Sequence, residues 1–175
     1  MADQAPDSIQ RNLTLPKHIG FIMDGNGRWA SGHGLQREDG HKYGVDSIEN
    51  LIQHMSDVGI QYVTLYAFST ENWNRPKSEV TSIFSLLRST LSNKLERLIE
   101  ANIQVRHIVN LKGINNTTRI AIERAIDATI SNTGMTVIVA INYGGRKEIV
   151  DAVKTIIATD IKPEEITETT IEKHL

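Results

Sequence analysis

The 175-residue sequence predicts an α/β domain built on a largely parallel β-sheet flanked by helices. Short runs rich in β-branched and aromatic residues alternate along the chain with longer segments whose apolar residues recur at helical spacing. Strands that alternate with helices pair in parallel, and we expect helices on both faces of the sheet. Polar loops follow two of the strands, and sheets of this kind bind ligands beyond the carboxyl ends of their strands.

Four short apolar runs are the expected strands. His18–Met23 is the first, and Ile60–Phe68, which is rich in β-branched and aromatic residues, is the second. Ile103–Val109 and Thr136–Asn142 are the third and fourth.

Five segments between and after these strands are the expected helices. Gly44–Gly59 carries an apolar stripe and ends at a glycine. A long helix runs from Pro76 to about Ala101, and a third from Asn116 to Ile130. Gly144-Gly145 turns into a helix that reaches Ile157, and Pro163–Leu175 is a weaker helical stretch.

Composition limits the class of protein. Residues 1–15 are expected to form a flexible N-terminal arm and residues 16–175 one domain, with the 39% hydrophobic content of a soluble globular protein. The net charge of −2 argues against nucleic-acid binding, which usually requires a basic excess. The absence of cysteine excludes disulfides and thiol catalysis. No apolar run reaches the length of a membrane span, so we expect a cytoplasmic protein.

The first loop, Asp24–Ala30 (DGNGRWA), has the composition of an anion-binding loop. Its two glycines let the backbone approach an anion and direct N–H groups at it. Arg28 can add a bidentate contact, and a helix that begins near Arg28 would add its positive end. The alternative is that Asp-Gly and Asn-Gly are only turn dipeptides.

The glycine spacing in Gly25–Ala30 also matches the fingerprint of an NAD(P)-binding, Rossmann-like oxidoreductase. Arg28 and Trp29 are bulky for that tightly packed loop. Asp24 would repel a pyrophosphate unless a divalent cation lay between them, and Mg²⁺ commonly binds one or two carboxylates together with phosphate oxygens. Asp24 therefore favours a Mg²⁺–diphosphate ligand, over which Arg37 and His41 can close.

The second loop, Ser69–Pro76, places polar, aromatic and cationic groups within eight residues. Trp73 either shields a carbocation with its π face or anchors the loop as a buried ring. The apolar residues of the helix that follows either form a core stripe or line a tunnel for an apolar tail. Sequence periodicity does not choose between the two roles of Trp73 or between the two roles of the helix.

Both loops belong to a longer series of motifs: His18-Ile-Gly-Phe-Ile-Met-Asp24-Gly-Asn-Gly-Arg-Trp29-Ala, Arg37-x-x-Gly40-His41-x-x-Gly44, Thr64-Leu-Tyr-Ala-Phe-Ser69-Thr-Glu-Asn-Trp73-Asn-Arg75-Pro and Asn142-Tyr-Gly-Gly-Arg146. From about residue 16 to residue 157, this series resembles the cis-prenyltransferase family, best known from undecaprenyl diphosphate synthase. The resemblance makes the NAD(P)-binding interpretation a remote alternative.

The resemblance implies the cis-prenyltransferase fold and the condensation of isopentenyl diphosphate with an allylic diphosphate such as farnesyl diphosphate. The product would be a cis-polyprenyl diphosphate, an undecaprenyl-like precursor of a cell-wall lipid carrier. A full-length chain would form a homodimer, and a long product implies peripheral membrane contact.

The resemblance also assigns roles to residues. Asp24 would be the catalytic carboxylate that binds Mg²⁺, and Asn72 would be the residue that is sometimes assigned as proton acceptor in the family. A neutral amide is a weak base, so Asn72 can instead position a reactant while a diphosphate oxygen takes the proton. The remaining substrate-binding residues would be Gly25, Asn26, Gly27, Arg28, Trp29, Arg37, His41, Ser69, Thr70, Glu71, Trp73 and Arg75.

The sequence departs from the family pattern in two places. Val109-Asn110 stands where the family has Gly-Asp, and family members continue beyond the position of Leu175. The continuation carries a further strand and an Arg-x-Ser-Gly-Glu segment, whose arginines hold isopentenyl diphosphate and whose acid completes the metal site. We therefore expect a fold that lacks its last strands and exposes an edge and apolar surface.

Three explanations of this departure remain: a fragment or frameshifted product of a synthase, an enzyme subunit completed by a partner chain, or a non-catalytic module that binds prenyl diphosphates. We favour the first, and we expect that the 175 residues alone do not elongate farnesyl diphosphate.

Overall fold

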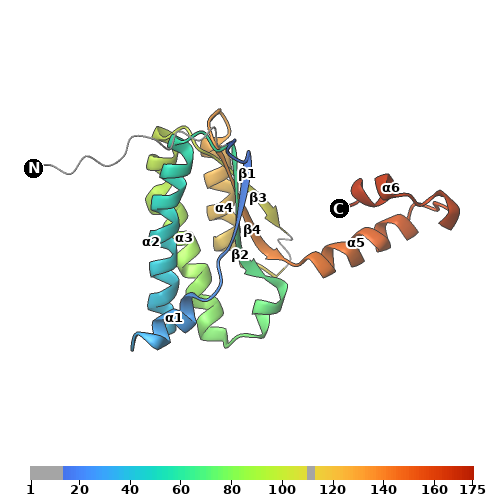
Figure 1. Cartoon of the computed structure of the whole chain (residues 1–175). Helices are drawn as coiled ribbons and strands as arrows, with labels where there is room; N and C mark the ends of the chain where they lie inside the picture. Colours follow the sequence, from blue (N-terminus) through green and yellow to red (C-terminus); the bar gives the residue numbers. More distant parts are fainter. Residues whose placement is uncertain (1–13, 110–112) are drawn as a thin grey trace, which may run out of the picture.

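The computed structural model describes residues 14–109 and 113–175. Most of the arm predicted over residues 1–15, and Asn110, lie outside the described residues. The described strands form one four-stranded parallel sheet in the order β1-β2-β4-β3 (Figure 1). Their bounds are β1 His18–Ile22, β2 Tyr62–Ser69, β3 Gln104–Val109 and β4 Thr136–Tyr143. All four strands lie where the sequence predicts them.

The helices match the sequence prediction less closely than the strands do. Six α-helices are described: α1 Asn26–Gly32, α2 Arg37–Asp57, α3 Lys77–Glu100, α4 Asn116–Thr129, α5 Gly145–Ile157 and α6 Glu168–Glu172. Two 3₁₀ helices are also described: η1 Thr70–Asn74 lies between β2 and α3, and η2 Pro163–Glu165 lies between α5 and α6.

Two predicted helix boundaries are wrong. The helix expected to begin at Gly44 begins at Arg37, because Gln36 and Asp39 form a capping box two turns earlier. The helix expected over Pro163–Leu175 is divided into η2 and the short α6, with a cap at Thr167 between them.

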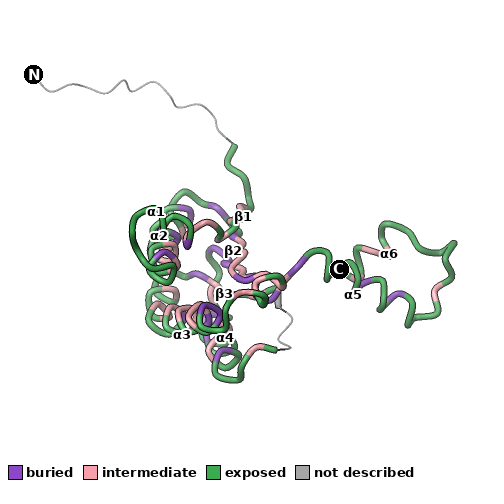
Figure 2. Tube along the Cα trace, turned by 90° about the horizontal axis from the view of Figure 1, so that it is seen from below, coloured by how far each residue is buried: buried purple, intermediate pink, exposed green. Residues whose placement is uncertain are grey.

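The core lies between one face of the sheet and helices α2, α3 and α4 (Figures 1 and 2). One cluster joins α3 and α4 to β3 and β4 around Phe84, Val105 and Ile122. The other joins the end of α2 to the sheet around Met55, Val63 and Val137. Burial of these alternate strand residues supplies the main driving force for folding.

The prediction of helices on both faces is wrong for the described residues. The strand residues that point away from α2, α3 and α4 include Ile22, Tyr62 and Ile108, which are 76%, 44% and 41% exposed. Helix α5 leads away from the sheet at the end of β4 and does not fold back over this face (Figure 1). Its own apolar residues Ile149 and Ile157 are also exposed. The expected exposed apolar surface is therefore present.

Among the described residues, no helix is long and apolar enough to cross a membrane.

Candidate active site

The two polar loops meet at the carboxyl edge of the sheet, as predicted. Asp24 follows β1 and Ser69 ends β2, and these two strands are paired neighbours. The backbone N–H of Met23 donates to the carbonyl of Tyr66 at 3.1 Å, which holds the first loop against β2 beyond the regular ladder. Parallel pairing therefore brings together two segments that are more than forty residues apart in the chain.

Glycines pack the first loop onto α2. Gly25 caps α1 with a φ of 88°, a left-handed conformation that favours glycine. A Cβ added at Gly40 would lie 2.1 Å from the backbone oxygen of Asn26, and one at Gly44 would lie 2.4 Å from its Nδ2. The Gly40 and Gly44 spacing thus lets α1 sit directly on α2. This packing fixes the first turns of α2, which carry Arg37 and His41, beside the loop.

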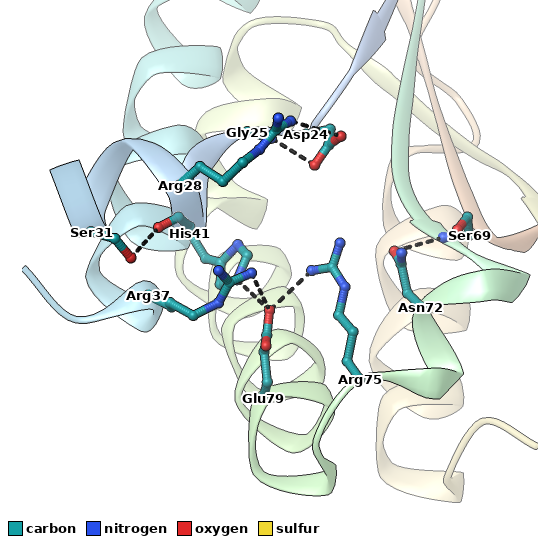
Figure 3. A network of polar contacts seen from close by, with 11 residues as sticks. Asp24, Gly25, Arg28, Ser31, Arg37, His41, Ser69, Asn72, Arg75 and Glu79 are labelled. Carbon is teal, nitrogen blue, oxygen red and sulfur yellow. Dashed lines mark hydrogen bonds and ion pairs between the residues drawn. The ribbon is translucent and has the colours of Figure 1, made fainter.

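Three of the predicted substrate-binding residues, Arg37, His41 and Arg75, converge on one buried carboxylate, that of Glu79 (Figure 3). Its Oε1 accepts from Arg75 Nη1 at 3.1 Å and lies 3.4 Å from both Arg37 Nη2 and His41 Nε2. Glu79 is 6% exposed and sits in the first turn of α3. We call Arg37, His41, Arg75 and Glu79 the Glu79 cluster. In this cluster, side chains from α2 and from the end of the second loop surround the same carboxylate.

The cluster controls the ionisation of Glu79. Burial alone would raise the pKa of this carboxyl. The hydrogen bond and charge of Arg37, the hydrogen bond of His41 and the charge of Arg75 act in the opposite direction and together hold the pKa of Glu79 below its ordinary value. Glu79 is therefore an anion at neutral pH, and it partly neutralises the cations that it gathers.

Asp24 lies apart from the Glu79 cluster and is largely exposed (Figure 3). Its carboxylate accepts the N–H of Gly25 at 2.7 Å and pairs with Arg28 at 3.4 Å. Among the described residues, no group of three or more His, Cys, Asp or Glu side chains could hold a metal ion. One accessible carboxylate nevertheless fits Mg²⁺ when phosphate oxygens and water supply the remaining ligands.

The second loop is a 3₁₀ helix, η1, with a capping box at its start. Asn72 Oδ1 accepts the backbone N–H of Ser69 at 3.1 Å. The oxygen of this amide is thus engaged in holding the turn, and its NH₂ group is the part that can serve a ligand. The pKa of Glu71 is lowered, first by a hydrogen bond from its own backbone N–H and then by Ser69, Thr70 and the charge of Arg146.

Trp73 is held on several sides. Its ring stacks on Phe84 with centroids 5.5 Å apart and meets the edge of Phe68 at 5.1 Å. Its Nε1–H donates to Asn142 Oδ1 at 2.7 Å. The ring is 40% exposed and lines an open cavity of about 660 Å³ together with Thr70 and Asn142. The indole is therefore anchored by its contacts with Phe68, Phe84 and Asn142, although it is not the buried ring that this interpretation assumed, and the shielding role stays a prediction.

A second cavity, of about 340 Å³, lies between α2, α3 and the sheet. We call it the α2–α3 cavity. One part of its wall is polar and contains Asn26, His41, Asn72 and Arg75. Most of the remaining wall is apolar: Val45, Ile48, Ile52, Leu65, Ile83, Leu86, Leu87, Leu91, Leu98, Ile103, Val105, Val137 and Val139. A second polar set also lines the cavity: Glu49, Asn50, Gln53, Thr90, Lys94 and Arg97. The apolar stripe of α3 thus contributes both to the core and to a cavity wall, which reconciles the two interpretations of the sequence.

The structure divides the predicted site residues into groups. Asn26, His41, Asn72 and Arg75 share the wall of the α2–α3 cavity. Trp29 instead stacks on His33, with ring centroids 4.4 Å apart, and is 44% exposed. Sequence reasoning missed Glu79, although its position four residues after Arg75 on a helix was a usable signal of an ion pair.

Comparisons with known proteins agree with this geometry. The family model described as "Putative undecaprenyl diphosphate synthase" matches residues 22–175. An isoprenyl transferase of Neisseria meningitidis is 42% identical over 168 residues, covering 96% of this chain and 67% of its own. A ditrans,polycis-undecaprenyl-diphosphate synthase of Micrococcus luteus, named as specific for (2E,6E)-farnesyl diphosphate, is 43% identical, covering 92% of this chain and 66% of its own.

Solved structures show the same likeness. The lavandulyl diphosphate synthase of Lavandula x intermedia, in complex with dimethylallyl diphosphate, superposes with a TM-score of 0.84 at 32% identity, over 91% of this chain and 70% of its own. A "probable undecaprenyl diphosphate synthase" of Campylobacter jejuni superposes with a TM-score of 0.71 at 31% identity, over 91% of this chain and 68% of its own. The chain spans about two thirds of the length of these curated relatives. With its two loops at one sheet edge and its cationic end on an apolar cavity, this chain belongs to the undecaprenyl diphosphate synthase family of cis-prenyltransferases.

Proposed function

We propose that this chain binds an allylic prenyl diphosphate, with the diphosphate at the Glu79 cluster and the Asp24 loop and the prenyl tail in the apolar cavity. The observation that carries the proposal is the polarity of that cavity. Arginine, histidine and amide side chains stand at one part of its wall, and aliphatic side chains from α2, α3 and the sheet form most of the rest, together with a second polar set on α2 and α3: Glu49, Asn50, Gln53, Thr90, Lys94 and Arg97. A prenyl diphosphate has the same division into an anionic head and an apolar tail.

The reaction that follows is transfer of the prenyl group to isopentenyl diphosphate with formation of a cis double bond. Breaking the allylic C–O bond leaves negative charge on the departing diphosphate, and Arg37, His41 and Arg75 stabilise that charge. Mg²⁺ held by Asp24 would supply further charge stabilisation at the diphosphate. The apolar wall keeps water from the electrophilic carbon.

The proton that leaves isopentenyl diphosphate needs an acceptor. Asn72 is a poor candidate, because a neutral amide is a very weak base and its oxygen already accepts the Ser69 N–H. We assign Asn72 to positioning, and a diphosphate oxygen to accepting the proton. Glu79 keeps the cations in place before the diphosphate arrives.

Binding is tested by calorimetry with farnesyl diphosphate, the substrate in the name of the Micrococcus luteus relative. Asp24→Ala is expected to weaken binding in Mg²⁺ by roughly tenfold, the loss of one carboxylate from the ion's ligands. The exposed helix residue Asp46 gives a matched control, since Asp46→Ala removes a carboxylate away from both loops. Equal affinity of the Asp24→Ala variant and the parent would contradict the metal role.

A second candidate function is a non-catalytic subunit that binds prenyl diphosphates and needs a partner chain. The exposed apolar residues on α5 and on the open sheet face favour it. Incorporation of labelled isopentenyl diphosphate separates the two functions. Incorporation by the 175 residues alone would support the transferase and overturn our expectation that they do not elongate farnesyl diphosphate. Binding without incorporation, restored by an added chain, would support the subunit.

A homodimer, peripheral membrane contact and a cytoplasmic location, all expected from the sequence, stay predictions.

A further inference from the structure

We propose that Asn142 is a positioning residue that fixes η1, and through it the reacting end of the site, by holding the indole of Trp73. The inference rests on the proposed function for its consequence but not for its geometry. It gives a role to the Asn142-Tyr-Gly-Gly-Arg146 motif, to which the proposed function assigns none.

The backbone of Asn142 is in an unusual conformation. Its φ is 54°, in the left-handed region, although it is not glycine and sits at the end of a strand. Asparagine tolerates this region better than most residues, and such conformations persist where the surrounding structure holds them. Asn142 is also 9% exposed. The turn of the chain places its side chain so that Oδ1 accepts Trp73 Nε1–H at 2.7 Å.

The two residues that follow Asn142 are also held in place, Tyr143 by β2 and Gly144 by the second loop. A Cβ at Gly144 would lie 2.3 Å from Thr70 Oγ1, so the start of η1 packs directly on the backbone there. The hydroxyl of Tyr66, on β2, donates to the carbonyl of Tyr143 at 3.0 Å. The chain at the end of β4 thus contacts η1 at two points: Gly144 lies against Thr70, and Asn142 binds Trp73.

The position of η1 matters because this one segment serves two cavities. Asn72 lines the α2–α3 cavity, whereas Thr70 and Trp73 line the open cavity of about 660 Å³. Asn142 lines the open cavity as well. Packing on Phe68 and Phe84 fixes the plane of the indole, and the hydrogen bond fixes its polar edge. Loss of that bond lets η1 shift, and Asn72 shifts with it.

The first arm of the test follows Trp73 directly. The chain has two tryptophans, so Trp29→Phe leaves Trp73 as the only indole reporter. In this background, Asn142→Gly keeps the left-handed backbone but removes the acceptor, and Asn142→Asp keeps an acceptor oxygen. Asp160→Gly is the control, because Asp160 also has a positive φ, of 55°, and is exposed beyond α5. We expect a red-shifted emission and stronger acrylamide quenching in Asn142→Gly alone.

The second arm measures farnesyl diphosphate affinity by calorimetry in chains that retain Trp29. Asn142→Gly is expected to weaken binding roughly fivefold, which corresponds to about one hydrogen bond, while Asp160→Gly binds as the parent does. Unchanged Trp73 emission and quenching in folded Asn142→Gly would overturn the proposal. So would a changed emission with unchanged affinity.

If Asn142→Gly does not fold, Trp73→Phe tests the same hydrogen bond. This variant keeps an aromatic ring against Phe68 and Phe84 but lacks the N–H donor. Parent-like affinity in Trp73→Phe would overturn the proposal. If the parent itself does not bind farnesyl diphosphate, the proposed function fails, and the fluorescence arm still decides whether Asn142 holds Trp73.

Discussion

The Glu79 cluster and the Asp24 loop both carry charges for the same proposed ligand, but the fold treats them differently. Glu79 is almost fully buried and faces two arginines and a histidine from two parts of the chain. Asp24 and Arg28 form one ion pair in which the side chains are 65% and 77% exposed. The cluster is thus assembled by the packing of α2 against α3 and the second loop, whereas the exposed pair is held only by its own loop.

The difference indicates two stages of preparation for a diphosphate. The cations of the cluster are positioned before the ligand arrives, because Glu79 acts as an internal counter-ion. Such preorganisation lowers the reorganisation that accompanies charge development. Asp24 keeps accessible oxygens and gains its full role only when Mg²⁺ and phosphate complete the set of ligands. Changes in the cluster should therefore alter folding stability, and changes in the exposed pair should alter binding alone.

The largest effect on stability is expected where the two regions are joined, at Gly40. In Gly40→Ala the new Cβ would lie 2.1 Å from the Asn26 backbone oxygen, so α1 must move off α2. We expect a loss of roughly 3 kcal/mol in the free energy of unfolding, measured by urea denaturation. Gly32→Ala is the matched control, since its Cβ meets nothing within 4 Å. Equal stability of the two variants would show that α1 is not held by this contact.

How far the sequence predicts this site depends on the kind of contact. Strand positions and the meeting of the two loops follow from local composition and from parallel pairing, so Asp24 and Ser69 could be placed at one edge. The Glu79 cluster could not, because its contact with Arg37 spans 42 residues and depends on how α2 packs on α3. The direction of α5 could not be predicted either, because an apolar stripe on a helix does not show whether that helix packs on the sheet.

An intermediate effect is expected from Glu79→Gln, and it should depend on pH. The folded pKa of Glu79 lies below its ordinary value of 4.5, so its ionised form stabilises the fold above that pH. We expect the variant to be less stable than the parent by roughly 2 kcal/mol at pH 7. The difference should shrink as the pH falls below the ordinary pKa, and it should vanish below the lower pKa of the folded state, where the parent's carboxyl is protonated in both states.

Glu49→Gln provides the comparison for Glu79→Gln. Glu49 also pairs with two cations, Lys94 at 2.8 Å and Arg97 at 2.6 Å, but it is 31% exposed. Solvent screens that pair, so its removal should cost less at pH 7. Chemical denaturation at pH 7 and at pH 3 measures both variants. A stability difference for Glu79→Gln that persists unchanged at the lower pH would rule out the ionised carboxylate as its cause.

The smallest effect on stability is expected from Arg28→Ala, on the exposed side of the comparison. Its ion pair with Asp24 is 3.4 Å long and open to solvent, and such pairs contribute less than about 0.5 kcal/mol. Affinity for farnesyl diphosphate should nevertheless fall, and the loss should shrink as salt is added, because an exposed cation is screened. Denaturation measures the change in stability, and calorimetry on the same preparation measures the change in affinity. A large loss of stability in Arg28→Ala would mean that the exposed pair, like the Glu79 cluster, is part of what holds the fold together.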